Sequence, residues 1–387
     1  MNAIASYDLA PLAGIVLAGA LLALGPLAWV WLRHRDARPA ARLQALTVLT
    51  LFLTFDLVLF GAFTRLTDSG LGCPDWPGCY GSASPVGAYG EIHAAQSALP
   101  SGPVTQGKAW VEMTHRYVAT GVGALIAALA VMSWIEARRR RSEDLSVSPW
   151  WATLTLGWVC LQGAFGALTV TMKLYPAIVT AHLLGGLGLL VLLALQSQSY
   201  MRTSLALSPG LYRASLLLAL LTVLQVALGG WVSTNYAVLA CQDFPTCQGH
   251  WWPTMDFDHG FTILRHLGAG KDGGFLPFAA LTAIHYVHRL VAYVVLGALA
   301  LFAWRLHASG DAPQRRWALG LSGVALWQLA SGLGNVLLGW PLVAAVAHTA
   351  GAAALVTMLT ILITQARHGR RLSLLRGFAG RSVQAAP

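Results

Sequence analysis

The chain has 387 residues, of which 56% are hydrophobic and only 10% are charged. Soluble domains carry about 25% charged residues, and the mean hydropathy here reaches +0.60. A chain this apolar has too little polar surface to cover a water-soluble fold. The composition therefore excludes an ordinary soluble protein and favours one dissolved largely in lipid.

Long hydrophobic runs predict about nine membrane-spanning helices. A helix needs about 20 apolar residues to cross the roughly 30 Å of hydrocarbon in a bilayer. Runs of this length occupy 10–32, 43–63, 111–135, 150–171, 177–197, 211–232, 280–304, 316–338 and 342–364. A spanning β-barrel would instead show short segments of alternating hydrophobicity. The sequence predicts an all-α integral membrane protein.

The first run is predicted to be a retained helix. A signal peptide opens with positive charge, whereas no Lys or Arg precedes this run and Asp8 does. The run is also longer than the apolar region of a signal peptide. It stands apart from the rest of the chain as an extra N-terminal helix.

Basic residues predict the orientation. The formal net charge is +10, and 18 of the 25 Lys and Arg residues fall in the loops after the first, third, fifth and seventh runs and in the tail. They are Arg33, Arg35, Arg38, Arg42, Arg138 to Arg141, Arg202, Arg213, Arg305, Arg315, Arg316, Arg367, Arg370, Arg371, Arg376 and Arg381. Cytoplasmic loops are enriched in Lys and Arg. We therefore expect an outer N-terminus, a cytoplasmic C-terminus and no nucleic-acid partner.

Two long outer loops, near 64–110 and 233–279, each contain a Cys-x5-Cys segment. The first reads CPDWPGC from Cys73 to Cys79, and the second reads CQDFPTC from Cys241 to Cys247. In this orientation both face the oxidising compartment, where disulfides persist. Each pair is expected to close a short turn as a structural staple. A redox or proton-transfer role for the first pair is the alternative.

The chain also repeats itself within the membrane. Residues 162–185 and 328–351 align without gaps, so that Gln162 matches Gln328 and His182 matches His348. Upstream, His115-Arg116 and His288-Arg289 match in the same way. The repeat divides the chain into an extra helix and its loop at 1–42, four-helix halves at 43–200 and 201–366, and a basic tail at 367–387. Repeated halves are common in membrane proteins.

Histidine is costly inside a membrane span and is usually functional there. His115, His182, His288 and His348 lie at repeat-related places, each one or two turns from an outer helix end. Axial histidines commonly hold haem iron, and the cores of helix bundles commonly host cofactors. Each half is therefore predicted to hold one haem between two imidazoles. The alternative is that each histidine only bonds a neighbouring helix.

Residues beside these histidines suggest how a macrocycle could be accommodated. Small residues at Gly185, Gly186, Gly188 and Gly351 would leave room for a flat ring against the helix. Arg116 and Arg289 directly follow two of the histidines near the outer interface. They are predicted either to contact haem propionates or to extend to lipid headgroups.

The features that carry a family resemblance are the Glu-x-x-His-Arg segment from Glu112 to Arg116, the four spaced histidines, the tandem halves and the cysteine loops. Through them the chain resembles the haem A synthase family over about residues 43–364. The resemblance implies a membrane-bound oxidoreductase that converts haem O into haem A for cytochrome oxidase, by oxidising a ring methyl to a formyl group. It implies haem b held by His288 and His348, and substrate haem held by His115 and His182. It also implies a catalytic role for Glu112.

The same resemblance implies a bacterial-type inner membrane and several partners. These are the haem O substrate, haem O synthase, cytochrome oxidase assembly factors and an electron donor. One sequence difference supports different roles for the two halves, with substrate haem in the first and haem b in the second. Glu112 lies three residues before His115, whereas His285 lies three residues before His288. A diheme electron-transfer cytochrome or a haem carrier would not need this difference. His285 remains an alternative to His288 as a ligand.

Overall fold

The computed structural model describes residues 9–139, 147–201 and 203–384, with side chains up to residue 375. It divides into two compact units, one comprising the chain up to Leu189 with Thr262–Leu276, and the other comprising Leu190–Phe261 with the chain from Pro277 onward. Arg140, Arg141 and Arg202 of the predicted basic loops lie outside the described residues. The four-part division expected from the repeat stays a prediction.

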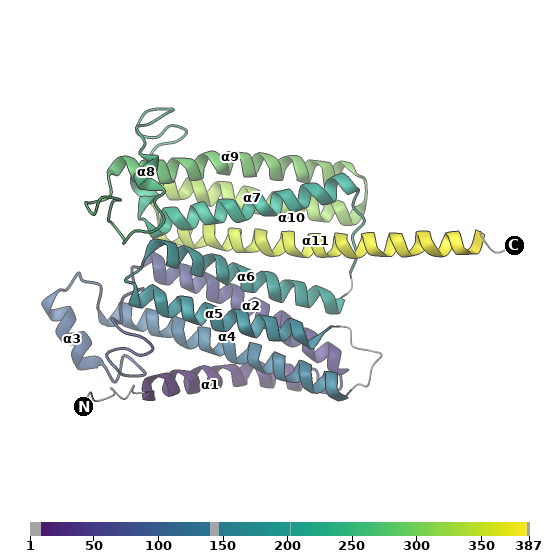
Figure 1. Ribbon diagram of the computed structural model, residues 1–387, viewed down its shortest axis with the longest axis horizontal. Helices are drawn as coiled ribbons and strands as arrows, with labels where there is room; N and C mark the ends of the chain where they lie inside the picture. Colours follow the sequence, from purple (N-terminus) through teal and green to yellow (C-terminus); the bar gives the residue numbers. More distant parts are fainter. Residues whose placement is uncertain (1–8, 140–146, 202, 385–387) are drawn as a thin grey trace. The chain divides into compact units, whose positions relative to one another are not determined.

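The first unit is built from long helices that run alongside one another (Figure 1). They are α1 (Ala10–Arg33), α2 (Pro39–Leu66), α4 (Gln106–Arg139), α5 (Pro149–Thr171) and the first part of α6 (Pro176–Met201), with the short α3 (Tyr89–Ala98) in the loop before α4. Proline begins several of them, because its fixed φ suits the first helical turn and its missing N–H has no partner there in any case. The Ser148 side chain caps α5.

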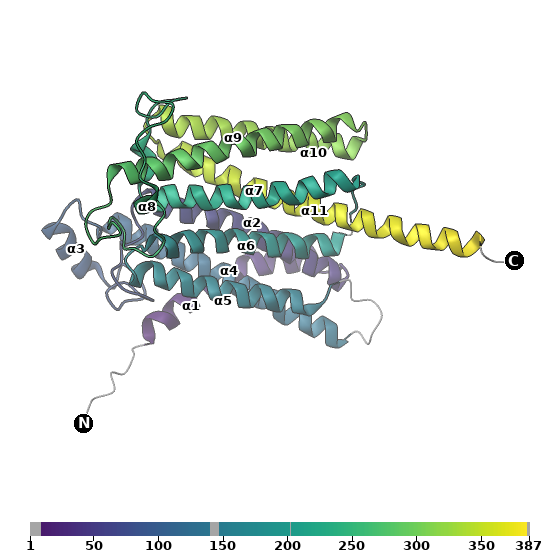
Figure 2. The same cartoon turned by 45° about the horizontal axis from the view of Figure 1, so that its top comes forward.

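The second unit repeats this plan. It holds the rest of α6 and the helices α7 (Pro209–Thr234), η1 (Ala237–Ala240), α8 (Phe257–Gly260), α9 (Phe278–Ala308), α10 (Ala312–Leu337) and α11 (Leu342–Gln384). Helix α9 packs against α7 and α10, and α11 packs against α10 and α7. Their shared core includes the buried side chains of Leu299, Leu306, Leu321 and Leu362. Figure 2 shows the short η1 and α8 region at one end of these helices.

Eight of the nine predicted runs lie inside a long helix, and the run 316–338 ends one residue beyond α10. Eight helices are long and apolar enough to cross a membrane: α1, α2, α4, α5, α6, α7, α9 and α11. Helix α10 has 26 residues but begins with the polar segment around Arg315 and Arg316, and its role as a ninth span stays a prediction. Across the described ranges, β-structure is limited to isolated bridges. The all-α membrane fold is confirmed.

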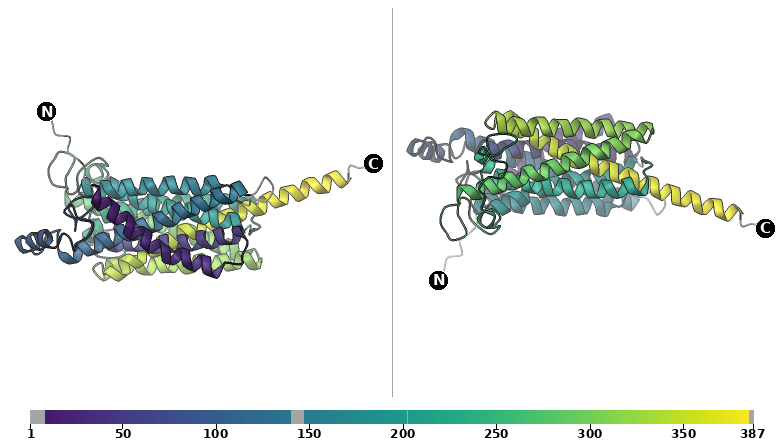
Figure 3. Two further views of the ribbon diagram at one scale, coloured as in Figure 1. Left: turned by 90° about the horizontal axis from the view of Figure 1, so that it is seen from below. Right: turned by 90° about the horizontal axis from the view of Figure 1, so that it is seen from above.

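Two helices have features that the repeat does not explain. The extra helix α1 packs closely on α4, where a Cβ added to Gly19 would lie 2.5 Å from the Thr120 side chain. Helix α11 has 43 residues, and at 1.5 Å per residue it is about 65 Å long, roughly twice the hydrocarbon thickness. Figure 3 shows α11 continuing past the ends of α9 and α10.

Candidate functional site

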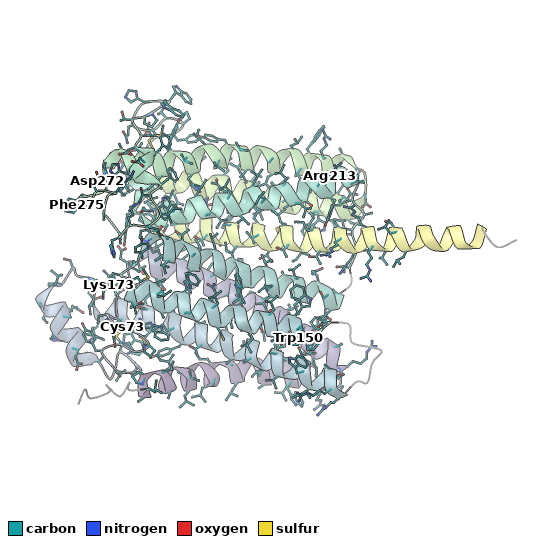
Figure 4. The ribbon with its side chains drawn as sticks, viewed as in Figure 1. Cys73, Trp150, Lys173, Arg213, Asp272 and Phe275 are labelled. Carbon is teal, nitrogen blue, oxygen red and sulfur yellow. A yellow bond between two sulfur atoms is a disulfide. The ribbon has the colours of Figure 1, made fainter. Side chains whose placement is uncertain are left out.

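The first cysteine loop is a compact turn closed by a disulfide. Cys73 and Cys79 are bonded, with their Cα atoms 4.9 Å apart. Inside the turn, Asp75 Oδ1 accepts a hydrogen bond from the Tyr80 backbone N–H at 2.6 Å, and Oδ2 accepts one from Gly81 N–H at 2.8 Å. Figure 4 shows Cys73 at one end of the first unit and Trp150 at the other. The loop is therefore a rigid cap on one end of that unit's helices.

The second cysteine loop repeats this construction. Cys241 and Cys247 form a disulfide, and Asp243 accepts hydrogen bonds from the backbone N–H groups of Gln248 and Gly249. The Thr246 hydroxyl also donates to Asp243. This hydroxyl, together with the two backbone donors, lowers the pKa of Asp243 to about 2. Both predicted disulfides are confirmed, and the redox alternative for the first stays a prediction.

Arg116 and Arg289 have a role that the sequence analysis missed: each holds its cysteine loop. The Arg116 guanidinium donates to the backbone carbonyls of Asp75, Pro77 and Gly78. In the second unit, Arg289 donates in the same way to the carbonyls of Cys241, Asp243 and Thr246. Neither lipid headgroups nor haem propionates are needed to explain these arginines. A propionate contact stays a prediction.

Glu112 joins the first loop to α4. Its side chain is 4% exposed. One carboxylate oxygen accepts the Cys73 backbone N–H at 2.8 Å, and the other pairs with the Arg116 guanidinium at 2.5 Å. A carboxylate this buried needs such partners. Glu112 therefore contacts both the disulfide and the residue next to His115.

His285 occupies the equivalent place in the second unit with different contacts. It is 4% exposed, and its ring hydrogen-bonds to the backbone of Ala237 in η1. Nδ1 of the same ring is buried and has no hydrogen-bond partner among the described residues. His285 therefore anchors η1 to α9, and the choice between His288 and His285 as the ligand stays a prediction.

The four repeat-related histidines form two pairs, one in each unit. His115 on α4 lies close enough to His182 on α6 for the two rings to interact electrostatically. His288 on α9 is related to His348 on α11 in the same way. All four are partly buried. The structure thus brings together the residues that the repeat predicted to act as pairs.

Each histidine ring lies against a glycine of a neighbouring helix. A Cβ added to Gly61 would stand 3.0 Å from His115 Nε2, and one added to Gly229 would stand 3.0 Å from His288 Cε1. The corresponding distances are 3.5 Å from Gly166 to His182 and 3.3 Å from Gly332 to His348. The sequence analysis missed Gly61 and Gly229. The signal was present, because each lies in the helix that precedes a cysteine loop.

The glycines expected to make room for a macrocycle serve a different purpose. A Cβ on Gly185 would collide with the Gln162 carboxamide at 1.9 Å, and a Cβ on Gly351 would meet Trp327 at 2.6 Å. Gly188 lies against Trp158. These glycines allow α5 to approach α6 and α10 to approach α11, because a larger side chain would separate the helices.

Two polar side chains beside the histidines of the second unit were also missed. Ser331 Oγ lies 2.9 Å from His348 Nδ1, and Gln225 Nε2 lies 3.1 Å from His288 Nδ1. A sequence signal existed for Gln225. Gln-x3-Gly occurs from Gln162 to Gly166, from Gln225 to Gly229 and from Gln328 to Gly332, and it places both residues on one helix face.

These residues fit a haem in each unit. Two imidazoles from different helices converge, as bis-histidine ligation requires. A glycine beside each ring keeps the neighbouring backbone close without a side chain in the way. Nδ1 of His182 is buried without a hydrogen-bond partner in the described part of the chain, so the protein leaves this ring nitrogen unpaired. The donor set suits an iron porphyrin.

Comparisons with known proteins identify the family. Residues 44–360 match the model of the family described as cytochrome oxidase assembly protein, COX15-CtaA. A protein of Shewanella oneidensis named heme A synthase is 38% identical over 81% of this chain and 93% of its own length. Relatives with the same name in Methylobacterium radiotolerans and Halalkalibacterium halodurans are 28% and 25% identical, over 84% and 79% of this chain and 88% and 91% of their own lengths. The chain therefore belongs to the COX15-CtaA family of cytochrome oxidase assembly proteins.

Proposed function

We propose that this multi-pass membrane protein is a haem A synthase, an oxidoreductase that converts a ring methyl of haem O into the formyl group of haem A. The family and the names of its relatives support this reaction. The observation that carries it is the pairing of four histidines, one pair in each unit, with every ring against a glycine. Each of two successive hydroxylations of one methyl carbon is a two-electron oxidation that adds one oxygen atom, and it requires an external oxidant of the dioxygen class together with the proposed electron donor. The resulting geminal diol loses water to leave the aldehyde.

We propose that the two histidine pairs have different tasks. His288 and His348 would hold haem b, which when bound supplies a redox-active iron. His115 and His182 would hold the haem substrate and orient its methyl group. The carboxylate of Glu112 supports this assignment, because the substrate pair has an acidic neighbour where the cofactor pair has His285.

Glu112 is proposed to act on charge and protons near the substrate. Its carboxylate is held on both oxygens by Cys73 N–H and Arg116, so its position is fixed before substrate arrives. A fixed, buried carboxylate can stabilise positive charge that develops as a methyl group is oxidised, or exchange a proton with the hydroxyl group added to that carbon. The first disulfide then serves catalysis by holding the N–H that orients Glu112.

The proposed orientation places the cysteine loops and both histidine pairs toward the outer face of a bacterial-type inner membrane. The basic loops and the C-terminal segment of α11 would lie in the cytoplasm, as the enrichment of Arg predicts. Haem O synthase, an electron donor and cytochrome oxidase assembly factors are the proposed partners.

The deciding experiment is extraction and chromatography of the pigments bound to the purified chain, produced with and without a haem O synthase. Haem b alone without that enzyme, and haem O or haem A in its presence, would support the proposal. Haem b in both preparations would instead identify a diheme electron-transfer cytochrome. Absence of haem, with all four histidines intact, would contradict both functions.

A further inference from the structure

Ser331 fixes the tautomer of His348. A hydroxyl has one proton to donate, and the Ser331 hydroxyl donates it to the Trp327 carbonyl at 2.7 Å. While that proton is donated to the carbonyl, the oxygen accepts from His348 Nδ1–H, 2.9 Å away. With the proton on Nδ1, the lone pair of His348 resides on Nε2. That is the tautomer that binds iron through Nε2.

Gln225 can do the same for His288. Its carboxamide lies 3.1 Å from His288 Nδ1, and its Oε1 is buried without a hydrogen-bond partner among the described residues. The amide nitrogen also donates to the His288 backbone carbonyl at 3.2 Å and lies 3.4 Å from His288 Nε2. The oxygen and nitrogen of an amide exchange places by rotation about the last side-chain bond. In the rotated form Oε1 accepts from Nδ1–H, at the expense of the bond to the His288 carbonyl.

The first unit lacks both polar side chains. The gapless repeat places Phe165 opposite Ser331, one residue before Gly166 as Ser331 is one before Gly332. Leu57 stands four residues before Gly61, where Gln225 stands four before Gly229. Neither Phe nor Leu can accept a hydrogen bond. Consistent with this, His182 Nδ1 is buried with no partner within the described residues.

We infer that Ser331 and Gln225 are positioning residues that make the His288–His348 pair a permanent haem site, and that Phe165 and Leu57 leave the His115–His182 pair able to release its haem. This inference rests on the proposed function and extends it to turnover. A synthase must retain its cofactor haem and release its product haem, although both use two histidines.

The physical basis is the contact that a ligating histidine makes with its second ring nitrogen. An acceptor at Nδ1–H fixes the ring orientation and makes Nε2 a stronger donor to the metal, and removing such a contact typically weakens metal binding about 10- to 100-fold. The contact also favours the oxidised iron. The first unit lacks this contact at His182 and has Leu57 in place of the Gln225 side chain near His115, so its haem should dissociate faster.

The test measures haem loss from the second unit alone. The full chain with His182→Ala, produced without a haem O synthase, should carry haem b only between His288 and His348. In that background Ser331→Thr keeps the hydroxyl, whereas Ser331→Val has nearly the same size without it. We expect haem b to transfer to apomyoglobin about 10- to 100-fold faster from the Val variant than from the Thr variant.

A second readout is the reduction potential of the bound haem b, which should be higher in the Val variant. Ser322→Ala is the matched control, because Ser322 is an exposed serine on the same helix. Gln225→Leu should also accelerate haem loss. Equal transfer rates and potentials for the Thr and Val variants would overturn the inference. Failure of both variants to bind haem would also overturn it, because the size of the side chain, and not its hydroxyl, would then determine haem binding.

The reciprocal change tests the first unit. In a His288→Ala background loaded with haem O, Leu57→Gln should slow haem transfer to apomyoglobin relative to Leu57→Met. Equal rates would contradict the inference for this unit. These outcomes are separable from failure of the proposed function, because that function fails only if the wild-type chain makes no haem A.

Discussion

The two cysteine loops are nearly identical in construction, whereas the surroundings of the two histidine pairs differ. In both loops a disulfide closes the turn and an aspartate accepts two backbone N–H groups. An arginine also donates to a matching carbonyl, that of Gly78 in the first loop and of Thr246 in the second. Beside the histidines, the first unit has the Glu112–Arg116 pair where the second has His285. Duplication has thus kept the frame that holds two histidines, and the functional difference resides in a few side chains that surround them.

Replacing single histidines should give the largest difference between the two units in bound haem b and in haem A production. His288→Ala or His348→Ala should abolish bound haem b, because one of its two proposed ligands is lost. His115→Ala or His182→Ala should retain haem b but produce no haem A. Pigment extraction and absorption spectra of the purified variants measure both outcomes.

His266→Ala is the matched control, since His266 is an exposed histidine that contacts the Tyr175 ring and belongs to neither pair, and its removal should leave both pigments unchanged. Loss of haem b from the His115 variant would show that the cofactor had been assigned to the wrong unit.

Replacing the acidic residue should have the next largest effect. Glu112→Gln keeps an acceptor for Cys73 N–H but removes the negative charge, and we expect haem A production to fall about 100-fold, as for loss of an acid–base group. His285→Gln, the matched change in the second unit, should alter production little. Chromatography of haem A against retained haem b distinguishes the two variants. A similar loss of haem A production in both variants would contradict the catalytic role of Glu112, because that role depends on a difference between Glu112 and His285.

The smallest expected effect concerns the aspartates of the loops. Because the folded-state pKa of Asp243 is lowered to about 2 from 3.8, its ionised form stabilises the fold fully above about pH 4, and this stabilisation is lost as the pH falls through about 2. Asp243→Asn should cost about 1 kcal/mol near neutral pH, after allowance for solvent screening, and less in acid. Thermal unfolding between pH 7 and pH 2 measures the difference.

Asp75→Asn provides the comparison. Gly78 stands where the second loop has Thr246, so the hydroxyl donor that Asp243 receives has no counterpart there, and a smaller loss is expected. A pH-independent difference between wild type and Asp243→Asn would show that the ionised form contributes nothing.

Much of the architecture was predictable from the sequence, because hydrophobic length, charge distribution and repeat spacing are local or periodic signals. They located every long helix, both disulfides and the paired histidines. Helix α3 was missed, since its ten residues carry no strong apolar period. The contacts of Arg116 and Arg289 could not be predicted, because they depend on backbone carbonyls that a loop turns toward them only after folding.

The interpretation of glycine shows the same limit. Position in the repeat identified Gly185 and Gly351 as special, but it could not say whether the missing side chain faced a ligand or a neighbouring helix. The structure assigns them to contacts between helices, and it assigns Gly61 and Gly229 to the histidines. The spacing of residues in the sequence does not give the direction in which each glycine faces.

The glycine behind each histidine has a consequence for interpreting natural variation. A change such as Gly61→Ala or Gly229→Ala would score as mild on any substitution scale, yet its methyl group would stand 3.0 Å from an imidazole atom. The ring would have to shift by a few tenths of an ångström to accommodate it, and we expect such a shift to weaken the proposed ligation. In a variant sequence, these changes should be classed with histidine replacements, although no histidine codon is altered.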